Sequence, residues 1–176
     1  MTKNNQSVVL GGGCFWCLEA AYQQLRGVTE VISGYSGGEA PNPTYEAVCS
    51  GATGHAEVVK VVYDPDVIRL DMILAVFWTI HDPTTLNRQG ADVGSQYASV
   101  IFYTDDEQHD AAHASRDEAQ QQLDEQIVTR IEKLGEFYEA EDYHRDYYEN
   151  NQNAGYCRAV IEPKLRKLRQ HFSALL

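Results

Sequence analysis

The sequence predicts an α+β protein, a two-layer α/β sandwich with a ferredoxin-like (split β-α-β) core and a C-terminal extension. Valine-rich runs typical of strands alternate with longer runs whose apolar residues recur at helical spacing. Their order is strand, helix, strand, and then again strand, helix, strand, which is the split β-α-β pattern. A chain of 176 residues is long enough to bury a proper core. We therefore expect a single domain over residues 1–176.

The first strand–helix–strand unit occupies residues 8–35. The apolar run Val8–Leu10 predicts one strand, and Val28–Tyr35 predicts another. Between them, Cys14–Arg26 carries apolar residues at helical spacing and is followed by Gly27, a helix-stop residue. Three glycines separate the first strand from this helix, and they allow tight backbone turns there.

The second unit begins at His55–Tyr63, a valine-rich run that predicts a strand and stops at an Asp-Pro pair. Leu70–His81 carries apolar residues on one helical face, and Ala98–Tyr103 predicts the closing strand. Between these two, Asp82–Gln96 is polar and contains proline and glycine, which predicts a long functional loop. Thr44–Cys49 predicts one helical turn in the connection before this unit.

The last third of the chain is more polar. Thr104 opens a capping-box pattern for a long helix that ends near Gln126, and Val128–Leu134 alternates like an edge strand. Glu141–Asn150 predicts a short helix, and Lys164–Phe172 predicts a basic closing helix. Residues 150–155 are polar and carry no helix or strand signal. We therefore expect residues from about 150 to 176 to form a mobile or wrapping C-terminal tail.

Composition narrows the possible functions. The net charge is −12, with 14 Lys and Arg against 26 Asp and Glu, which argues against a nucleic-acid partner. No apolar run approaches the roughly 20 residues that cross a membrane, so no membrane partner is expected. The polar first residues do not resemble a signal peptide. Four cysteines without secretory features indicate reduced, catalytic thiols and a cytoplasmic protein.

Cys14 and Cys17 form a C-x-x-C pair at the start of the first predicted helix. Backbone N–H groups and the positive end of the helix dipole favour a thiolate over a thiol at this position. The preceding glycines leave room for a substrate, and Trp16 is next to the thiol in sequence, so a reactive thiol is favoured over a small core cysteine. Cys49 has apolar neighbours, and we expect it to be a buried structural thiol.

Glu57 stands at the head of the valine-rich strand that starts near residue 55. Taken alone, a glutamate at this position is expected to face solvent. A desolvated carboxyl at the same position would have a raised pKa and could give up a proton near neutral pH.

Two other functions stay open on these residues. One is a general thiol–disulfide oxidoreductase that acts on protein disulfides through Cys14 and Cys17 and has no need of Glu57. The other is a zinc-binding module made of cysteines and histidines. A second C-x-x-C is absent, and His109 and His113, four residues apart, belong to a helix that is polar all round. We therefore expect no metal site.

Seven short motifs follow one another between about residue 8 and residue 164. They are Gly13–Cys17, Gly34–Gly38, Pro43–Tyr45, Gly54–Glu57, His81–Thr84, Gly90–Tyr97 and Ala140–His144. Together they resemble the peptide methionine sulfoxide reductase A family, and several long motifs in order are far more specific than any one of them.

The resemblance implies an oxidoreductase that reduces methionine sulfoxide, free or in proteins, to methionine, which repairs proteins under oxidative stress. The S epimer is the substrate expected from the family. The roles that the resemblance implies are Cys14 as nucleophile, Glu57 as the acid on the sulfoxide oxygen, Phe15 and Trp16 as the wall for the methyl group, Tyr45 and Tyr97 as hydrogen-bond donors to that oxygen, Asp92 on the polar side, and His144 at the rim. No metal and no organic cofactor is implied.

The cycle that the resemblance implies needs a second cysteine. Attack by Cys14 leaves a sulfenic acid, the second cysteine converts it to a disulfide, and thioredoxin regenerates the enzyme. We expect Cys157 to be this resolving cysteine, because it follows a polar run and lies in a Gly-Tyr-Cys sequence similar to the one that family members use. Cys17 is a possible second redox thiol, although a bridge to Cys14 would strain the first helical turn.

Overall fold

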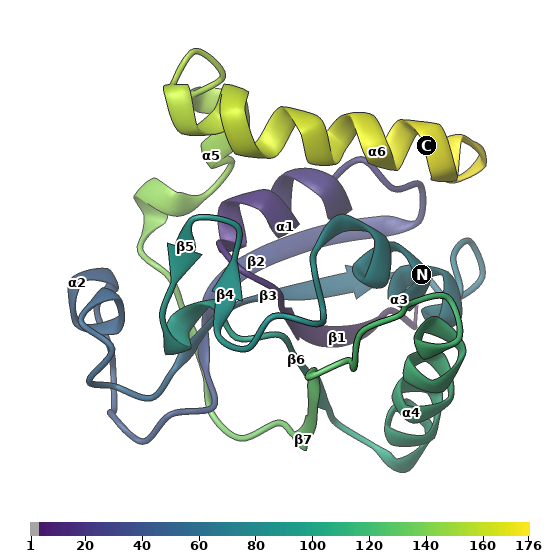
Figure 1. Ribbon diagram of the computed structural model, residues 1–176, viewed down its shortest axis with the longest axis horizontal. Helices are drawn as coiled ribbons and strands as arrows, with labels where there is room; N and C mark the ends of the chain where they lie inside the picture. The colour runs from purple at the N-terminus through teal and green to yellow at the C-terminus, as the bar shows by residue number, and fades with distance from the viewer. Residues whose placement is uncertain (1–3) are drawn as a thin grey trace.

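The computed structural model describes residues 4–176, which form a mixed α/β fold around a central sheet (Figure 1). The strands of this sheet are β1 (Gln6–Gly11), β2 (Val28–Ser36), β3 (Ala56–Tyr63), β6 (Val100–Tyr103), β7 (Arg130–Lys133) and β8 (Phe137–Glu139). The helices are α1 (Phe15–Tyr22), α2 (Tyr45–Cys49), α3 (Leu70–Ile80), α4 (Asp106–Gln120), α5 (Tyr147–Asn150) and α6 (Glu162–Phe172). Two short strands, β4 (Arg88–Gln89) and β5 (Asp92–Val93), pair with each other apart from the central sheet.

The central sheet has the strand order β7-β6-β1-β3-β2-β8. Its neighbours are antiparallel, except for β6 and β7, which run parallel at one edge. Helix α1 lies between β1 and β2 in the chain, and α3 lies between β3 and β6. Because β1 and β3 are central and antiparallel, the end of β1 at Gly11 and the start of β3 near Glu57 lie at the same end of the sheet.

The two faces of the sheet are covered differently, as alternating side chains require. The main core joins one face to the helices and contains side chains from β1, β3, α1, α3 and α6, among them Leu10, Val59, Leu18, Phe77 and Leu165. The other face carries a small cluster without helical residues, made of Val9, Ala56, Val58, Val100 and Phe102 with Leu134 and Phe137 packed against it. The helices that contribute to the main core thus lie on one side of the sheet.

The strands and helices expected for the two strand–helix–strand units are found at their predicted places. Helix α1 is shorter than predicted, because the N–H groups of Gln24 and Leu25 bond to carbonyls only three residues back. Helix α4 likewise ends at Gln120 rather than near Gln126. The sequence analysis missed β8, whose three residues pair with β2, and the β4–β5 hairpin inside the long polar loop.

The C-terminal segment wraps over the helical layer, and Figure 1 shows α6 lying along α1. A π-helix over Cys157–Ile161 precedes α6, in which Leu165 and Leu168 are buried in the main core. The backbone N–H of Arg26 donates to the carbonyl of Leu175 at 2.7 Å, which ties the end of the chain to the loop after α1. Among residues 4–176, no helix is both long and apolar enough to cross a membrane.

Candidate active site

Cys14 is the residue that caps the N-terminus of α1, directly after the turn that leaves β1. Gly13 has a φ of +94°, and a Cβ there would lie 2.7 Å from Cγ of Gln89, so the turn needs glycine for both conformation and space. The carbonyl of Cys14 accepts from the N–H of Cys17 at 3.1 Å. Cys14 as a whole residue is 7% exposed, and it lines a small cavity.

Glu57 lies beside this helix start, on β3, and is 1% exposed. Its Oε1 accepts from the backbone N–H of Phe15 at 3.2 Å, and its Oε2 has no hydrogen-bond partner among the described residues. Burial raises the pKa of Glu57 to about 8, although the hydrogen bond from Phe15 opposes the shift. Of the two interpretations of Glu57, the structure therefore supports a desolvated carboxyl with a raised pKa rather than a side chain that faces solvent.

The pKa values of the two thiols of the C-x-x-C pair are shifted in opposite directions. Burial raises the pKa of Cys14 well above its usual value, and the hydrogen bond to Cys17 and the charge of Glu57 act in the same direction. The hydrogen bond with Cys14 lowers the pKa of Cys17 to about 7 despite burial. Burial therefore opposes the thiolate that the helix end was expected to favour at Cys14, while the backbone hydrogen bond from Trp16 acts in the thiolate's favour.

An aromatic wall stands next to Cys14. Phe15 is fully buried, and the Trp16 indole stacks on the Tyr147 ring with centroids 3.7 Å apart and planes 6° apart. The indole N–H donates to Nδ1 of His144 at 3.0 Å, so His144 holds the indole in place. His144 is itself 0% exposed, and burial lowers its pKa, which keeps the ring neutral; it lies behind the wall rather than at the rim.

Tyr45 and Tyr97 are half-buried and both lie close enough to Glu57 and Cys14 to feel their charges. Burial, reinforced by Glu57, raises the pKa of each phenol, so both remain neutral hydrogen-bond donors. The carboxylate of Glu141 accepts from the backbone N–H of Tyr45 at 2.9 Å and holds the start of α2 in place.

The polar side of the site is built by a residue that sequence reasoning missed, Tyr156. Its hydroxyl donates to Oδ2 of Asp92 at 2.9 Å and lies 3.7 Å from Sγ of Cys17. Its ring meets the Trp16 indole edge to face at 5.8 Å and 80°. Tyr156 stands in the Gly-Tyr-Cys sequence that pointed to Cys157, so the signal was present but was assigned to its neighbour.

A cavity of about 220 Å³ lies on the polar side of the site, and its lining is Cys14, Cys17, Gln89, Gly90, Ala91, Asp92, Tyr156, Val160 and Lys164. A larger hollow of about 880 Å³ between α3 and α6 has no cysteine in its lining. The smaller cavity is therefore the one of these two that reaches the Cys14 and Cys17 thiols.

The remaining cysteines differ from each other. Cys157 is fully buried in the π-helix, where burial and the charge of Cys17 raise its pKa. Cys49, at the end of α2, is exposed, so the prediction of a buried structural thiol is wrong. Helix α2 is only five residues long, and just one of them, Val48, is buried. All four cysteines are free thiols.

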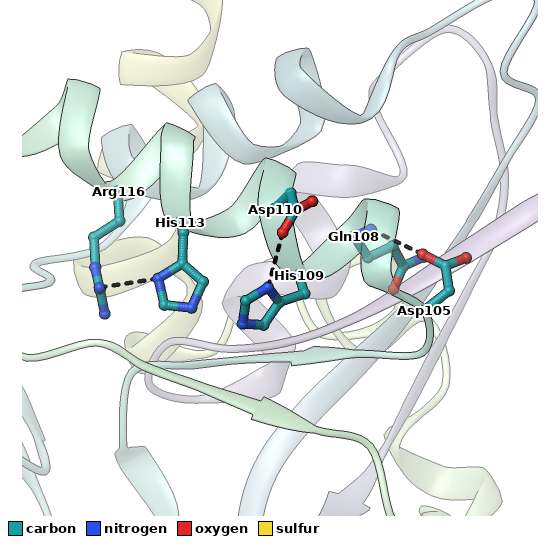
Figure 2. A network of polar contacts seen from close by, with 6 residues as sticks. All are labelled: Asp105, Gln108, His109, Asp110, His113 and Arg116. Carbon is teal, nitrogen blue, oxygen red and sulfur yellow. Dashed lines mark hydrogen bonds and ion pairs between the residues drawn. The ribbon is translucent and has the colours of Figure 1, made fainter.

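The histidine pair of α4 bonds within its own helix, as Figure 2 shows. Nδ1 of His109 is 3.0 Å from Oδ1 of Asp110, and Nδ1 of His113 is 3.1 Å from Nη2 of Arg116. In the described part of the chain, no group of three or more His, Cys, Asp or Glu side chains is placed to hold a metal ion.

The predicted site residues thus lie near one another and come from α1, β3, α2, β5 and two 3-10 turns; they are Cys14, Phe15, Trp16, Glu57, Tyr45, Asp92, Tyr97 and His144. The Cys14 thiol, the Glu57 carboxyl and the phenols of Tyr45 and Tyr97 lie close enough for their charges to affect one another. This combination suits attack by sulfur on a substrate whose leaving atom needs a proton. The site defines a thiol-dependent oxidoreductase.

The chain belongs to the peptide methionine sulfoxide reductase family, whose model matches residues 6–176. It is 54% identical over 173 residues to peptide methionine sulfoxide reductase MsrA of Chromobacterium violaceum, covering 97% of this chain and 98% of the relative. The crystal structure of reduced Mxr1 from Saccharomyces cerevisiae is similar, with a TM-score of 0.83 and 36% identity over 87% of this chain and 89% of that one. A structure of Mxr1 in complex with Trx2 covers 84% of this chain and 89% of that one, with 25% identity and a TM-score of 0.59. The protein is a thiol-dependent reductase of methionine sulfoxide, as the sequence resemblance implied.

Proposed function

We propose that Cys14 attacks the sulfoxide sulfur while Glu57 gives a proton to the sulfoxide oxygen and takes one from the Cys14 thiol. The observation that carries this proposal is a buried carboxyl with a pKa of about 8 beside a thiol whose pKa is also raised. Near neutral pH both groups hold their protons. The sulfoxide oxygen can take the Glu57 proton, and the carboxylate so formed can take the proton of the Cys14 thiol.

The step balances without any other reactant. Attack first forms a bond between the Cys14 sulfur and the substrate sulfur. That bond and the bond between the substrate sulfur and its oxygen then break as the protonated oxygen passes to the Cys14 sulfur, and the products are methionine and a sulfenic acid on Cys14. Glu57 ends the step protonated, as it began. Its unpartnered Oε2 is free to face the substrate, while Oε1 is held by the N–H of Phe15.

The pocket residues keep the roles that the resemblance implied. Phe15 and Trp16 are proposed to bury the methyl group of the substrate, because they form the apolar side of the space next to the thiol. Tyr45 and Tyr97 are proposed to donate to the sulfoxide oxygen, where charge develops as sulfur attacks. Asp92 is proposed to organise the polar side, and His144 to hold Trp16 from behind.

The oxidised site needs an external dithiol, and we propose thioredoxin. The Mxr1 structure in complex with Trx2 supports a partner of this kind. Cys157, the resolving cysteine expected from the sequence, and Cys17 are together proposed to carry the oxidising equivalent away from Cys14, and Cys157 is the thiol that passes it to the reductant. Because Cys157 is fully buried, the segment Tyr156–Ile161 must open before it can react. Thiol exchange alone completes this cycle, so no metal or organic cofactor is proposed.

The proposed substrates are free methionine sulfoxide and oxidised proteins, with the S epimer expected from the family. We also propose that residues 1–176 act as one catalytic domain with a ferredoxin-like core, since the strand order β6-β1-β3-β2 is antiparallel throughout and both crossover helices lie against one face. A reducing compartment such as the cytoplasm suits a cycle that starts from free thiols.

Two parallel assays of one variant distinguish the proposed reaction from that of a general thiol–disulfide oxidoreductase. Glu57→Gln is assayed for single-turnover methionine formation and, separately, for exchange with a protein disulfide. We expect the first to be slowed by about 10²- to 10⁴-fold and the second to be little changed. Equal effects on both reactions would contradict the acid role of Glu57.

A further inference from the structure

The hydroxyl of Tyr156 forms a bridge between Cys17 and Asp92 on the polar side of the cavity. It donates its only hydrogen to Oδ2 of Asp92 at 2.9 Å. The contact of 3.7 Å with Sγ of Cys17 must then run the other way, with the thiol donating to the phenol oxygen. The three groups therefore form a chain of donors that points from the Cys17 thiol to a carboxylate.

We propose that this chain is a proton path that deprotonates Cys17, so that Cys17 makes the first disulfide with Cys14. The inference rests on the proposed function, since it needs a sulfenic acid at Cys14. In the step, the Cys17 proton passes to the Tyr156 oxygen as the Tyr156 proton passes to Asp92. Tyr156 is thus a catalytic residue of the resolving reaction, because it touches the attacking sulfur.

Atoms and electrons balance in this step. The Cys17 sulfur attacks the Cys14 sulfur, an S–S bond forms, and the S–O bond of the sulfenic acid breaks. The Cys14 sulfur is reduced and the Cys17 sulfur is oxidised. The leaving hydroxide takes the proton of Glu57 and departs as water, so one proton moves from Glu57 to water and one from Cys17 to Asp92.

The surroundings suit such a transfer. Cys17 is 2% exposed, so bulk water has little access to its proton. Burial raises the pKa of Tyr156, so its hydroxyl stays protonated between transfers and gives one proton as it takes another. Asp92 is only partly buried, on the short strand β5 that borders the cavity, and can pass its proton on to solvent. Cys17 also shares a hydrogen bond with Cys14. Cys157 instead lies close enough to Cys17 for the Cys17 charge to raise its pKa.

The test is a single turnover of the full chain with one equivalent of methionine sulfoxide and no external reductant. Three quantities are followed by rapid quenching: the methionine formed, the sulfenic acid trapped by a 1,3-dione, and the first disulfide mapped by mass. In Tyr156→Phe we expect the sulfenic acid to persist about 10²-fold longer, with a smaller effect on methionine formation. Tyr148→Phe is the matched control, because Tyr148 lies on α5, outside the segment Tyr156–Ile161, and no hydrogen bond of its hydroxyl is found among the described residues.

The pH profile separates a proton path from a structural role. The titratable and charged groups that face Cys17 are Cys14, Glu57, Asp92, Tyr156, Cys157 and Lys164. In Tyr156→Phe and in Asp92→Asn, resolution should recover as the pH rises, because a larger share of Cys17 is then already a thiolate when the sulfenic acid forms. A packing defect would not be repaired by base. In the double variant the two losses should not add, since both break one path.

Three results would contradict the proposals. The first two contradict the proton path, and the third contradicts the proposed function. Resolution at the wild-type rate in a folded Tyr156→Phe, or in Asp92→Asn if Tyr156→Phe does not fold, overturns the proton path. A first disulfide between Cys14 and Cys157 overturns it as well, because Cys17 then never attacks. Absence of any sulfenic acid at Cys14 overturns the proposed function itself.

Discussion

The two walls of the active-site cavity are built in different ways. One wall is the turn from β1 into α1 together with the head of β3, where Cys14, Phe15 and Glu57 are held by backbone hydrogen bonds and the main core. The other wall is the segment that carries Tyr156, Cys157 and α6, which lies about 140 residues further along the chain. The first wall holds the proposed nucleophile and the proposed acid. The second wall lies outside the central sheet and holds the groups proposed for the steps that follow.

The groups proposed for substrate reduction and those proposed for regeneration of the thiols are therefore anchored to different parts of the fold. A nucleophile must be held in place before the substrate arrives, which a sheet end and a helix start provide. A thiol that hands its oxidation to a partner protein must later come to the surface, which a segment outside the sheet allows. The following variants test each wall in turn.

The largest effect is expected at the first wall. Cys14→Ser should abolish sulfoxide reduction, because a hydroxyl is scarcely ionised and is a far poorer nucleophile. The measurement is methionine released in a single turnover. Cys49→Ser, which removes an exposed thiol, is the control. Appreciable methionine release by the Cys14 variant would move the nucleophile to another residue.

Glu57→Gln should come next, with the reductive step slower by about 10²- to 10⁴-fold and binding roughly intact. The sign of the pH dependence follows from the pKa of about 8: the carboxyl holds its proton below that value and loses it above. The wild-type rate should therefore fall as the pH rises through about 8, while the variant should show no such fall. A variant with wild-type rates across this range would leave Glu57 without a role as an acid.

The second wall can be weakened through its anchor, Leu168 of α6, which is 0% exposed in the main core. Leu168→Ala should lower the free energy of unfolding by about 2–4 kcal/mol, because a buried cavity replaces the side chain. The measurement is a urea titration, with Leu86→Ala, an exposed loop residue, as the control. If the two variants are equally stable, Leu168 does not anchor the second wall to the main core.

The smallest effect is expected where the two walls meet, at Trp16. Trp16→Ala removes the indole that faces both Tyr147 and Tyr156, and burial of a methyl and neighbouring CH₂ group against it is worth roughly 1–2 kcal/mol. The value of kcat/KM should fall by about tenfold, while disulfide exchange with thioredoxin is largely preserved. An equal loss in both half-reactions would make Trp16 a structural residue of both walls.

Local rules were enough for the first wall. Hydrophobic periodicity, glycines and a helix-stop residue placed β1, α1 and the reactive cysteine, and the valine-rich run placed Glu57 on a strand. These signals depend on residues within a few positions of one another. The seven ordered motifs then identified the family, which the relatives confirm.

Other features required the folded chain. Whether Glu57 faced solvent or the core depended on its contact with the N–H of Phe15, 42 positions away. The raised pKa of the Cys14 thiol follows from burial by distant segments, which a helix-dipole argument does not contain. The exposure of Cys49 has the same origin, since the amount of α2 that is covered depends on what packs against it.

The sequence by itself therefore determined the order of the main elements, the place of Cys14 at a helix start and the family, because each depends on neighbouring residues. Only the tertiary structure decided which polar groups contact one another across the site. The Tyr156 hydroxyl lies against Cys17, 139 positions earlier, and against Asp92, 64 positions earlier, and no periodicity links such residues. Burial and hydrogen bonding across the fold set the protonation of these groups, so the chemistry of the second wall appears only when the chain has closed on itself.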